Sequence, residues 1–304
     1  MTLVKRLALI GTGLIGGSLA LDWRAAGAVQ EVAGWDASPV ALEQALACGI
    51  ISKKAAGPEE AAAGADLVLV AAPVKATCDL AARLGPKLKS GQVVTDVASV
   101  KAPVVAAWER YLPPGVEFVG GHPLAGSEKA GPRAARRGLF QGAAFVLTPA
   151  RTASSRATGL VASLVRLAGA NPVFLPAERH DALVAAVSHL PHLSAVALVN
   201  TAFELAGDAL DLSAGGFADT TRIALGSPVM WRDICLTNRD AILDALDRFS
   251  RQMARVRALV AAGKAAELEE LFAGARAIRS QLTGVKEETV CAFSPPANPM
   301  VRPS

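Results

Sequence analysis

Residues 7–16, LALIGTGLIG, decide how the first half of the chain folds. The four apolar residues at 7–10 are typical of a buried strand, and glycines then follow in a Gly-x-Gly-x-x-Gly pattern. Residues 14–26 next show the periodicity of a helix. A strand, a glycine turn and a helix in this order predict the first unit of a dinucleotide-binding sheet.

Each position of the glycine loop has a predicted role in binding the cofactor. Gly11 permits the tight turn, Gly13 lets the backbone approach a pyrophosphate, and Gly16 lets helix and strand pack closely. The helix that opens at Leu14 and Ile15 would turn its free N–H groups and the positive end of its dipole toward the phosphates. The alternative is a purely structural glycine turn.

Asp36 follows the second predicted strand, residues 32–35, and lies 20 residues after Gly16. Its carboxylate can accept hydrogen bonds from ribose hydroxyls and would repel a 2′-phosphate. Residues 37–42 contain no arginine or lysine that could bind such a phosphate. The sequence therefore favours NAD over NADP. The alternative is that Asp36 only caps the next helix, a role that Ser38 could also fill.

Short apolar runs and helical patterns continue to alternate up to residue 175. This rhythm predicts an α/β fold, with a Rossmann-like, doubly wound and mostly parallel sheet. The remaining strands of this half are expected at residues 67–72, 93–97, 116–119, 143–147 and 172–175, and its remaining helices at residues 39–47, 74–84, 103–111 and 153–168.

The second half shows helical periodicity alone, at residues 178–190, 192–206, 230–238, 239–262 and 265–282. We therefore expect a dinucleotide-binding domain at residues 1–177 and a helical substrate and dimerisation domain at residues 178–285. The proline-rich residues 286–304 are expected to form a mobile tail. Long Ala/Leu helices present more apolar surface than one small domain can cover, which predicts a homodimer.

The composition excludes several classes of protein. Of the 304 residues, 52% are hydrophobic and 19% charged, which argues against a disordered chain. The net charge is only +4, and its basic residues are scattered apart from Arg133, Arg136 and Arg137, so no nucleic-acid surface is expected.

The compartment follows from the cysteines and the N-terminus. The four cysteines form no Cys-x-x-Cys pair, which favours free thiols in a reducing compartment. The N-terminal apolar run is too short for a signal peptide, and we find no run of 18 apolar residues that would predict a membrane span. A soluble, cytoplasmic protein is expected.

Two predicted strands end in polar segments that should meet at one edge of the sheet. Residues 95–101, TDVASVK, follow one strand, and residues 120–131, GGHPLAGSEKAG, follow the next. Open α/β sheets bind ligands at this carboxyl edge, and histidine is well suited to move a proton near neutral pH. His122 is therefore the candidate proton acceptor. The alternatives are a turn histidine at His122 and a helix cap at Ser99.

Three further motifs follow: SHLPH at residues 188–192, GFADTTRIA at residues 216–224 and MWRDI at residues 230–234. The chain resembles the prephenate dehydrogenase family, which includes arogenate and cyclohexadienyl dehydrogenases. The resemblance lies in six segments that occur in the order GTGLIGGS, DVASVK, GGHPLAGSEKAG, HDALVAAVSHLPH, GFADTTRIA and MWRDI. The matching segments span residues 11–234, and the helical remainder fits the family's dimerisation region.

The resemblance implies oxidative decarboxylation of prephenate to 4-hydroxyphenylpyruvate, or of arogenate to tyrosine, with hydride transfer to NAD in tyrosine biosynthesis. It makes His122 the catalytic histidine and places Ser99 against the substrate hydroxyl and the nicotinamide. Arg222 would bind a substrate carboxylate, while His189 and Trp231 would line the pocket. No residue spacing decides between prephenate and arogenate.

The chemistry is consistent with these roles. Loss of a hydride from a carbon that bears a hydroxyl builds positive charge, which a base on the hydroxyl relieves, so neutral His122 would act as that base. Arg222 offers bidentate pairing to a carboxylate, and Asp219, one helical turn earlier, could orient it. Glu128 is either a solvated loop acid or an ionic gate over the pocket.

Several structural readings compete with these roles. Arg222 and Asp219 can be a structural ion pair, Trp231 can belong to the core, and His180 with Asp181 can be an ordinary pair at a helix start. His189 and His192 are not expected to bind a metal, because Pro191 lies between them and no acidic ligand has matching spacing.

Two other functions remain as alternatives. A β-hydroxyacid dehydrogenase also joins a nucleotide-binding sheet to helices, but it generally places a catalytic lysine in the helical domain, and residues 178–263 contain no lysine. A non-catalytic NAD-sensing protein would keep the glycine loop without needing His122 or Ser99.

Overall fold

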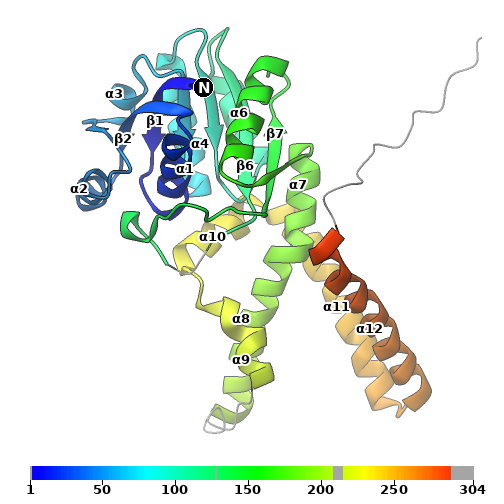
Figure 1. Ribbon diagram of the computed structural model, residues 1–304. Helices are drawn as coiled ribbons and strands as arrows, with labels where there is room; N and C mark the ends of the chain where they lie inside the picture. Colours follow the sequence, from blue (N-terminus) through cyan, green and yellow to red (C-terminus); the bar gives the residue numbers. More distant parts are fainter. Residues whose placement is uncertain (1, 127–128, 208–214, 289–304) are drawn as a thin grey trace, which may run out of the picture. The chain divides into compact units, whose positions relative to one another are not determined.

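The computed structural model describes residues 2–126, 129–207 and 215–288 and divides into two units, Met1–Ala245 and Leu246–Ser304. The first unit contains one eight-stranded sheet with the strand order β3-β2-β1-β4-β5-β6-β7-β8 (Figure 1). Its strands are β1 (Val4–Ile10), β2 (Val29–Trp35), β3 (Lys53–Lys54), β4 (Leu67–Val70), β5 (Val93–Asp96), β6 (Glu117–Pro123), β7 (Ala144–Pro149) and β8 (Asn171–Phe174).

The predicted doubly wound, mostly parallel sheet is confirmed. β1 pairs in parallel with β2 on one side and with β4 on the other, so the order of connection reverses at β1. A crevice is expected outside the carboxyl ends of the strands at such a reversal. The central strands are buried on both faces, which explains why their sequences are continuously apolar.

β6 and β7 are the one antiparallel pair between neighbours in this sheet. A parallel return usually needs a crossover helix, and the 20 residues between these strands supply no α-helix where the structure describes them. The short β3 and the helix α3 (Pro58–Ala62) were missed from the sequence because both are too short to show periodicity.

Helices cover both faces of the sheet. On one face, the Trp23 indole N–H of α1 (Leu14–Ala25) donates to the Leu164 carbonyl of α6 (Ser155–Leu167) at 2.8 Å. Trp108 of α5 (Ala102–Tyr111) stacks on Phe118 of β6, with 5.6 Å between ring centres. The other helices of this half are α2 (Pro39–Ala47) and α4 (Val74–Leu84).

After β8 the chain is helical. α7 (Ala177–Val184) and α8 (Leu190–Ala206) are joined without a break by a π-helical turn, Ala185–His189. The two separate helices predicted at residues 178–190 and 192–206 are therefore one continuous helix. Pro191 lies in the first turn of α8, where the π turn accommodates its missing N–H donor.

This joined helix, Ala177–Leu205, is long and apolar enough to cross a membrane by length and composition, since an 18-residue window within it has a mean hydropathy of 1.7. Joining the two segments corrects the expectation that no such stretch exists. The helix also carries His180, Asp181 and His189, whose side chains are buried and hydrogen-bonded inside the first unit. Core helices of soluble proteins meet the same test of length and composition.

Further helices are α9 (Gly215–Thr221), with a 3₁₀ turn at Arg222–Leu225, and α10 (Pro228–Thr237). Sequence periodicity did not predict α9 or the 3₁₀ turn. Residues 1–177 and 178–285 remain a prediction as domains, since the first compact unit extends to Ala245. Among the described cysteines, Cys48, Cys78 and Cys235 are free thiols, and Cys291 lies outside the described residues.

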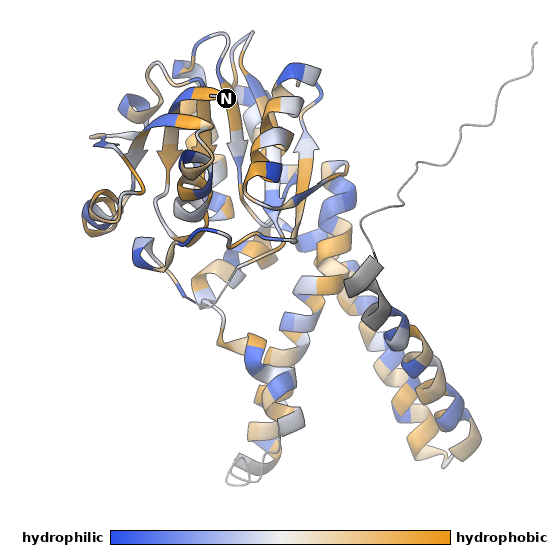
Figure 2. Ribbon diagram, viewed as in Figure 1, coloured by the Kyte–Doolittle hydropathy of each residue, from blue (hydrophilic) through white to orange (hydrophobic). Residues whose placement is uncertain are grey.

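The second unit contains the end of α11 (Arg239–Ala261) and α12 (Ala265–Glu288), joined by a short turn. Figures 1 and 2 draw them as a hairpin on which apolar and polar residues alternate. Exposed apolar side chains on it include Phe249, Met253, Val260, Phe272 and Ile278. The predicted tail at 286–304 begins as helix, and its residues 289–304 lie outside the described part of the chain.

Candidate functional site

The glycine loop after β1 has the geometry that dinucleotide binding requires. Gly11 has φ of +93°, and a Cβ there would lie 2.2 Å from the Ala71 carbonyl oxygen. A Cβ on Gly16 would lie 2.6 Å from the Ala71 side chain, so Gly16 allows α1 to pack close to β4. A Cβ on Gly13 would meet nothing within 4 Å, so the backbone there faces open space.

The helix that follows this loop begins without a side-chain cap. Gly13 is its N-cap residue and makes no side-chain hydrogen bond, since it has no side chain. The first N–H groups of α1, at Leu14 and Ile15, therefore have no capping side chain, and the positive end of the helix dipole faces the same space. This arrangement fits a pyrophosphate.

A pocket of about 410 Å³ lies beside the loop and is lined by Gly11, Gly13 and Asp36 among others. The Asp36 Oδ2 atom accepts the Thr12 backbone N–H at 2.8 Å, and Oδ1 accepts the Ser38 N–H at 2.9 Å. Ser38, not Asp36, caps α2 through the Ala41 N–H. The reading of Asp36 as only a helix cap is therefore wrong.

α4 brings a cation to this pocket that the sequence did not reveal. Arg83 lines the pocket, and its guanidinium carbon lies 5.9 Å from the centre of the Trp35 ring. Glu59 binds the guanidinium through two hydrogen bonds, at 2.7 and 3.0 Å. Those bonds lower the pKa of Glu59 to about 2. The charge of Arg83 is thus already engaged by a carboxylate.

At the carboxyl end of β6, His122 begins a chain of three polar side chains. Its Nδ1 lies 2.8 Å from Nε2 of His180, and Nδ1 of His180 lies 2.7 Å from Oδ1 of Asp181. Asp181 also accepts the backbone N–H groups of Lys101 and Ala102, at 2.7 and 2.8 Å. His180 and Asp181, on α7, are therefore part of the site.

A buried ion pair fixes the strand end beside His122. The Lys101 ammonium contacts the Asp96 carboxylate, and both side chains are fully buried. Lys101 also donates to the Gly121 carbonyl at 2.7 Å, while Asp96 accepts the Gly121 N–H at 2.9 Å. Because this pair binds both the N–H and the carbonyl of Gly121, the residue before His122, it fixes the backbone from which the imidazole extends.

The surroundings keep His122 neutral. Burial lowers the pKa of His122 well below 6.5, and the nearby charge of Lys101 lowers it further. An imidazole that is neutral at pH 7 has a lone pair free to accept a proton. His122 therefore has the protonation state that a general base needs.

His189 is a second buried histidine of the site. Burial lowers the pKa of His189 to about 4. Its Nδ1 lies 3.1 Å from the side-chain amide nitrogen of Asn238, which also donates to the Asp181 carbonyl at 2.9 Å. Trp231 meets His189 edge to face, with 5.9 Å between ring centres.

Trp231 and Arg222 line a larger pocket of about 970 Å³, together with Lys129, Gly226 and His192. Trp231 stacks on His192 at 3.5 Å, so its ring forms a wall of the pocket. A Cβ on Gly226 would lie 2.5 Å from the Trp231 indole nitrogen, so glycine is needed there. Arg222 is exposed, and no described residue forms an ion pair with it.

Three predicted residues are not joined to this cluster. Ser99 is half-buried after β5, does not cap α5, and has no hydrogen bond to another residue within the described ranges. Asp219 is exposed on α9 and forms no ion pair with Arg222 in the described part of the chain. Glu128 lies outside the described residues. The described residues contain no group of three or more potential metal ligands.

Besides Arg83, the sequence assigned no role in the site to Lys101, His180, Asp181 and Asn238. Their partners lie up to 80 residues away in the chain, so spacing carries no signal for the contacts. Only the polarity of His180 and Asp181 at the start of an apolar helix marked them. The same polarity is also expected if His180 and Asp181 are an ordinary pair of residues at the start of a helix.

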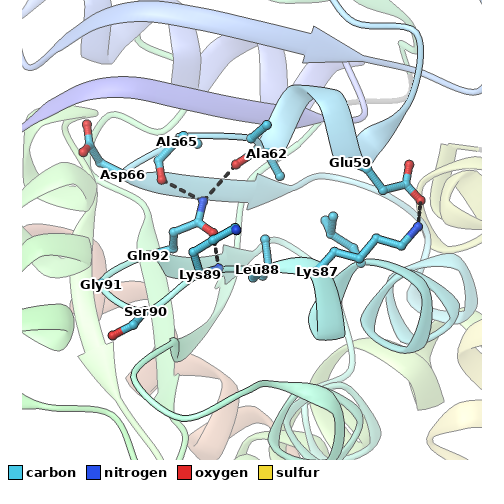
Figure 3. Close-up of a pocket in the computed structure, with 13 residues that line it drawn as sticks. Glu59, Ala62, Ala65, Asp66, Lys87, Leu88, Lys89, Ser90, Gly91 and Gln92 are labelled. Atoms are coloured by element: carbon cyan, nitrogen blue, oxygen red, sulfur yellow. Dashed lines mark hydrogen bonds and ion pairs between the residues drawn. The ribbon is translucent and has the colours of Figure 1, made fainter.

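A third hollow, of about 600 Å³, opens at the opposite edge of the sheet, before β4 and β5 (Figure 3). Its central polar group, Gln92, donates to the Ala62 and Ala65 carbonyls and accepts the Lys89 N–H. Both the oxygen and the nitrogen of this side chain are therefore hydrogen-bonded within the fold. The candidate site is at the carboxyl edge.

Comparison with known protein families gives two matches along the chain. The model described as "Prephenate dehydrogenase, nucleotide-binding domain" matches residues 19–174. The model described as "Prephenate dehydrogenase, dimerization domain" matches residues 176–274.

Individual relatives agree with these models. A prephenate dehydrogenase of Bacillus subtilis is 37% identical over 193 residues, which are 62% of this chain and 52% of the relative. A cyclohexadienyl dehydrogenase of Zymomonas mobilis is 35% identical over 51% of this chain and 54% of its own. The chain thus spans about half the length of the curated relatives it matches.

Solved structures match over most of their length. The prephenate dehydrogenase of Aquifex aeolicus, in complex with hydroxyphenyl propionate and NAD⁺, has a TM-score of 0.85 and 31% identity, with 91% of this chain and 98% of that chain covered. The arogenate dehydrogenase of Synechocystis has a TM-score of 0.78 and 26% identity, with 91% and 99% covered. A 3-hydroxyisobutyrate dehydrogenase at 18% identity shares the fold alone.

Proposed function

The chain belongs to the prephenate dehydrogenase family, and we propose that it oxidises and decarboxylates prephenate to 4-hydroxyphenylpyruvate, with NAD as the hydride acceptor. Arogenate, which would give tyrosine, is a second possible substrate. Either reaction serves tyrosine biosynthesis.

The residues around the glycine loop fit NAD. The open backbone at Gly13 and the uncapped start of α1 accommodate a pyrophosphate, and Asp36 lines the adjoining pocket with a carboxylate suited to ribose hydroxyls. The cofactor supplies the hydride acceptor when bound. Arg83, the nearest cation in that pocket, is held by Glu59, which is consistent with a preference for NAD over NADP.

His122 accepts the proton of the substrate hydroxyl at its ring nitrogen. As the C–H bond of the carbinol carbon breaks, positive charge builds on that carbon, and removal of the hydroxyl proton converts it to a carbonyl. The ring carboxylate then leaves as carbon dioxide, the electron pair of the broken C–C bond completes the aromatic ring, and the oxygen takes up a proton to become the phenol hydroxyl. Proton transfer of this kind contributes about 10²–10⁴-fold to the rate.

Arg222 anchors a carboxylate of the substrate. Its guanidinium is exposed on the large pocket and forms no ion pair with any residue that the structure describes, so it can pair bidentately with an incoming anion. Trp231 supplies an apolar wall for the substrate ring, and His189 stands behind that wall. Ser99 contacts the substrate hydroxyl.

The enzyme acts as a cytoplasmic homodimer. The helical region carries exposed apolar side chains, among them Leu198, Phe203 and Leu205 on α8, which a partner subunit would cover. The match to a dimerisation domain over residues 176–274 supports the same assembly.

One observation carries this proposal: a neutral histidine lies at the carboxyl edge of a sheet whose glycine loop is built for a dinucleotide. Initial rates with prephenate and arogenate, each with NAD and NADP, test it through the absorbance of the reduced cofactor. We expect turnover of prephenate with NAD as the best pair. Absence of turnover with both substrates would contradict the proposal.

A further inference from the structure

All four histidines of the chain lie in or beside the candidate site. For two of them, His122 and His189, the bonds of the surrounding residues specify which ring nitrogen carries the hydrogen. We propose that Asp181 sets these two histidines in opposite forms, so that His122 presents an acceptor nitrogen and His189 a donor nitrogen. This inference rests on the proposed function, because it assigns His122 the acceptor that the reaction needs.

The argument starts at the Asp181 carboxylate. Oδ1 accepts the Lys101 N–H and Oδ2 accepts the Ala102 N–H, and both donors lie at the start of α5. A backbone N–H can only donate, and the helix dipole favours an anion at this end. Asp181 is therefore an ionised acceptor on both oxygens.

The carboxylate fixes the hydrogen of His180. Nδ1 of His180 lies 2.7 Å from Oδ1 of Asp181, so this nitrogen must donate. In neutral His180 the other nitrogen, Nε2, is then an acceptor. It lies 2.8 Å from Nδ1 of His122, which must carry a hydrogen to make the bond. Nε2 of His122 is left with a free lone pair.

The backbone of Asp181 acts on the second histidine. Its carbonyl can only accept, so the Asn238 atom 2.9 Å away is the amide nitrogen. The same nitrogen lies 3.1 Å from Nδ1 of His189, and its second hydrogen makes Nδ1 an acceptor. With its pKa lowered to about 4, His189 is neutral at pH 7 and carries its one hydrogen on Nε2.

The chain of bonds also supports the charge that forms during turnover. When Nε2 of His122 takes a proton, the ring becomes an imidazolium whose Nδ1–H points at His180. His180 in turn donates to the carboxylate of Asp181, so the new positive charge is linked through one ring to a buried anion. His180, Asp181 and Asn238 are positioning residues, since they act through His122 and His189.

Nitrogen NMR of the full chain, labelled with ¹⁵N-histidine and saturated with NAD, tests the proposal directly. Four ring systems are few enough to assign by single substitutions. We expect hydrogen on Nδ1 of His122 and on Nε2 of His189. Hydrogen on Nε2 of His122, or the same form in both rings, would overturn the proposal even if prephenate is turned over normally.

Two variants test the individual links. H180F keeps a planar ring but removes the acceptor, so His122 should populate both of its neutral tautomers. We expect kcat to fall about 10- to 100-fold, because the imidazolium that His122 forms during turnover loses a hydrogen bond. D181N keeps an oxygen for the donors but removes the charge, so kcat should fall about tenfold while the affinity for NAD is unchanged.

Asp66 provides a matched control. Its carboxylate also accepts two consecutive backbone N–H groups, those of Lys5 and Arg6, at 2.8 and 2.9 Å, but it contacts no histidine. D66N should leave kcat and the histidine spectrum unchanged. A kcat equal to that of the wild type in both H180F and D181N would overturn the proposal. If a variant does not fold, the nitrogen NMR spectrum of the wild-type protein tests the proposal without it.

Discussion

At the amino edge of the sheet, Gln92 makes three hydrogen bonds, all to the backbone around it, whereas at the carboxyl edge Gly13 faces open space and Arg222 forms no ion pair with a described residue. Both edges are hollowed, and both contain charged and polar side chains. They differ in whether the fold has already satisfied those groups.

The same difference separates the charged groups of the two edges. At the amino edge Glu59 pairs with Lys87, as Figure 3 shows, and also with Arg83. At the carboxyl edge the Asp96–Lys101 and His180–Asp181 pairs are equally well bonded, yet they leave one nitrogen of His122 unused. The size of a pocket does not by itself identify a functional site. A better indicator is a polar group without a hydrogen-bond partner that is held in place by neighbours whose own hydrogen bonds are satisfied.

The largest effect should come from H122N. The asparagine amide can keep the hydrogen bond to His180 that Nδ1 makes, but it has no counterpart of Nε2 to accept the proton. We expect kcat to fall by about 10³-fold, within the range of general-base catalysis, with the affinity for NAD unchanged. Steady-state rates and NAD titration measure both, and a kcat like that of the wild type would refute the assignment.

The two edges should also respond differently to acid. Burial lowers the pKa of His189 from 6.5 to about 4, so between these pH values the unfolded state binds more protons and the free energy of unfolding falls as the pH falls. At about 1.4 kcal/mol per unit, His189 alone should account for up to about 3 kcal/mol. Glu59, whose pKa is about 2, stays ionised throughout this range.

Urea unfolding near pH 7 and near pH 5 measures this loss of stability. H189Q, which removes the titrating group, should show a shallower dependence on pH than the wild type. Equal slopes in the two proteins would show that His189 is not held neutral by burial.

Arg222 should affect binding more than chemistry. R222A removes a charge-assisted pair, so KM for prephenate should rise about 10- to 100-fold with a smaller change in kcat. R222K keeps the charge but not the planar guanidinium, so its KM should lie between those of the wild type and R222A. Steady-state kinetics distinguishes them, and an unchanged KM in R222A would count against the anchor.

The amino edge should give the smallest effect on activity. Q92L has a similar volume but leaves the Lys89 N–H and two carbonyls without their partner, which should lower the free energy of unfolding by about 1–3 kcal/mol. The kinetic constants below the unfolding temperature should not change. A raised KM for either substrate would mean that this edge takes part in function after all.

The sequence predicts well what depends on local pattern. The strand, glycine turn and helix around residues 7–16 and the helical second half follow from periodicity, and both are confirmed. His122 could be singled out because it follows an apolar strand that must end at the carboxyl edge. Its role as the base stays a prediction until it is measured.

What the sequence could not predict depends on contacts between distant segments. His180 meets His122 across 58 residues, and Asn238 meets Asp181 across 57, so no spacing rule reports either contact. The residues that follow β2 carry no sign of Arg83, because α4 brings this cation to the pocket from elsewhere in the chain. The only feature of the sequence that indicates an antiparallel β7 is the lack of a helical pattern between β6 and β7.

The most direct test of the central claim is a crystal structure of the enzyme with NAD and 4-hydroxyphenylpyruvate bound. We predict that Nε2 of His122 lies about 2.6–3.2 Å from the phenolic oxygen, at the carboxyl edge of β6, with the dinucleotide on the glycine loop. An imidazole turned away from that oxygen, or a ligand bound at the amino edge, would contradict the account.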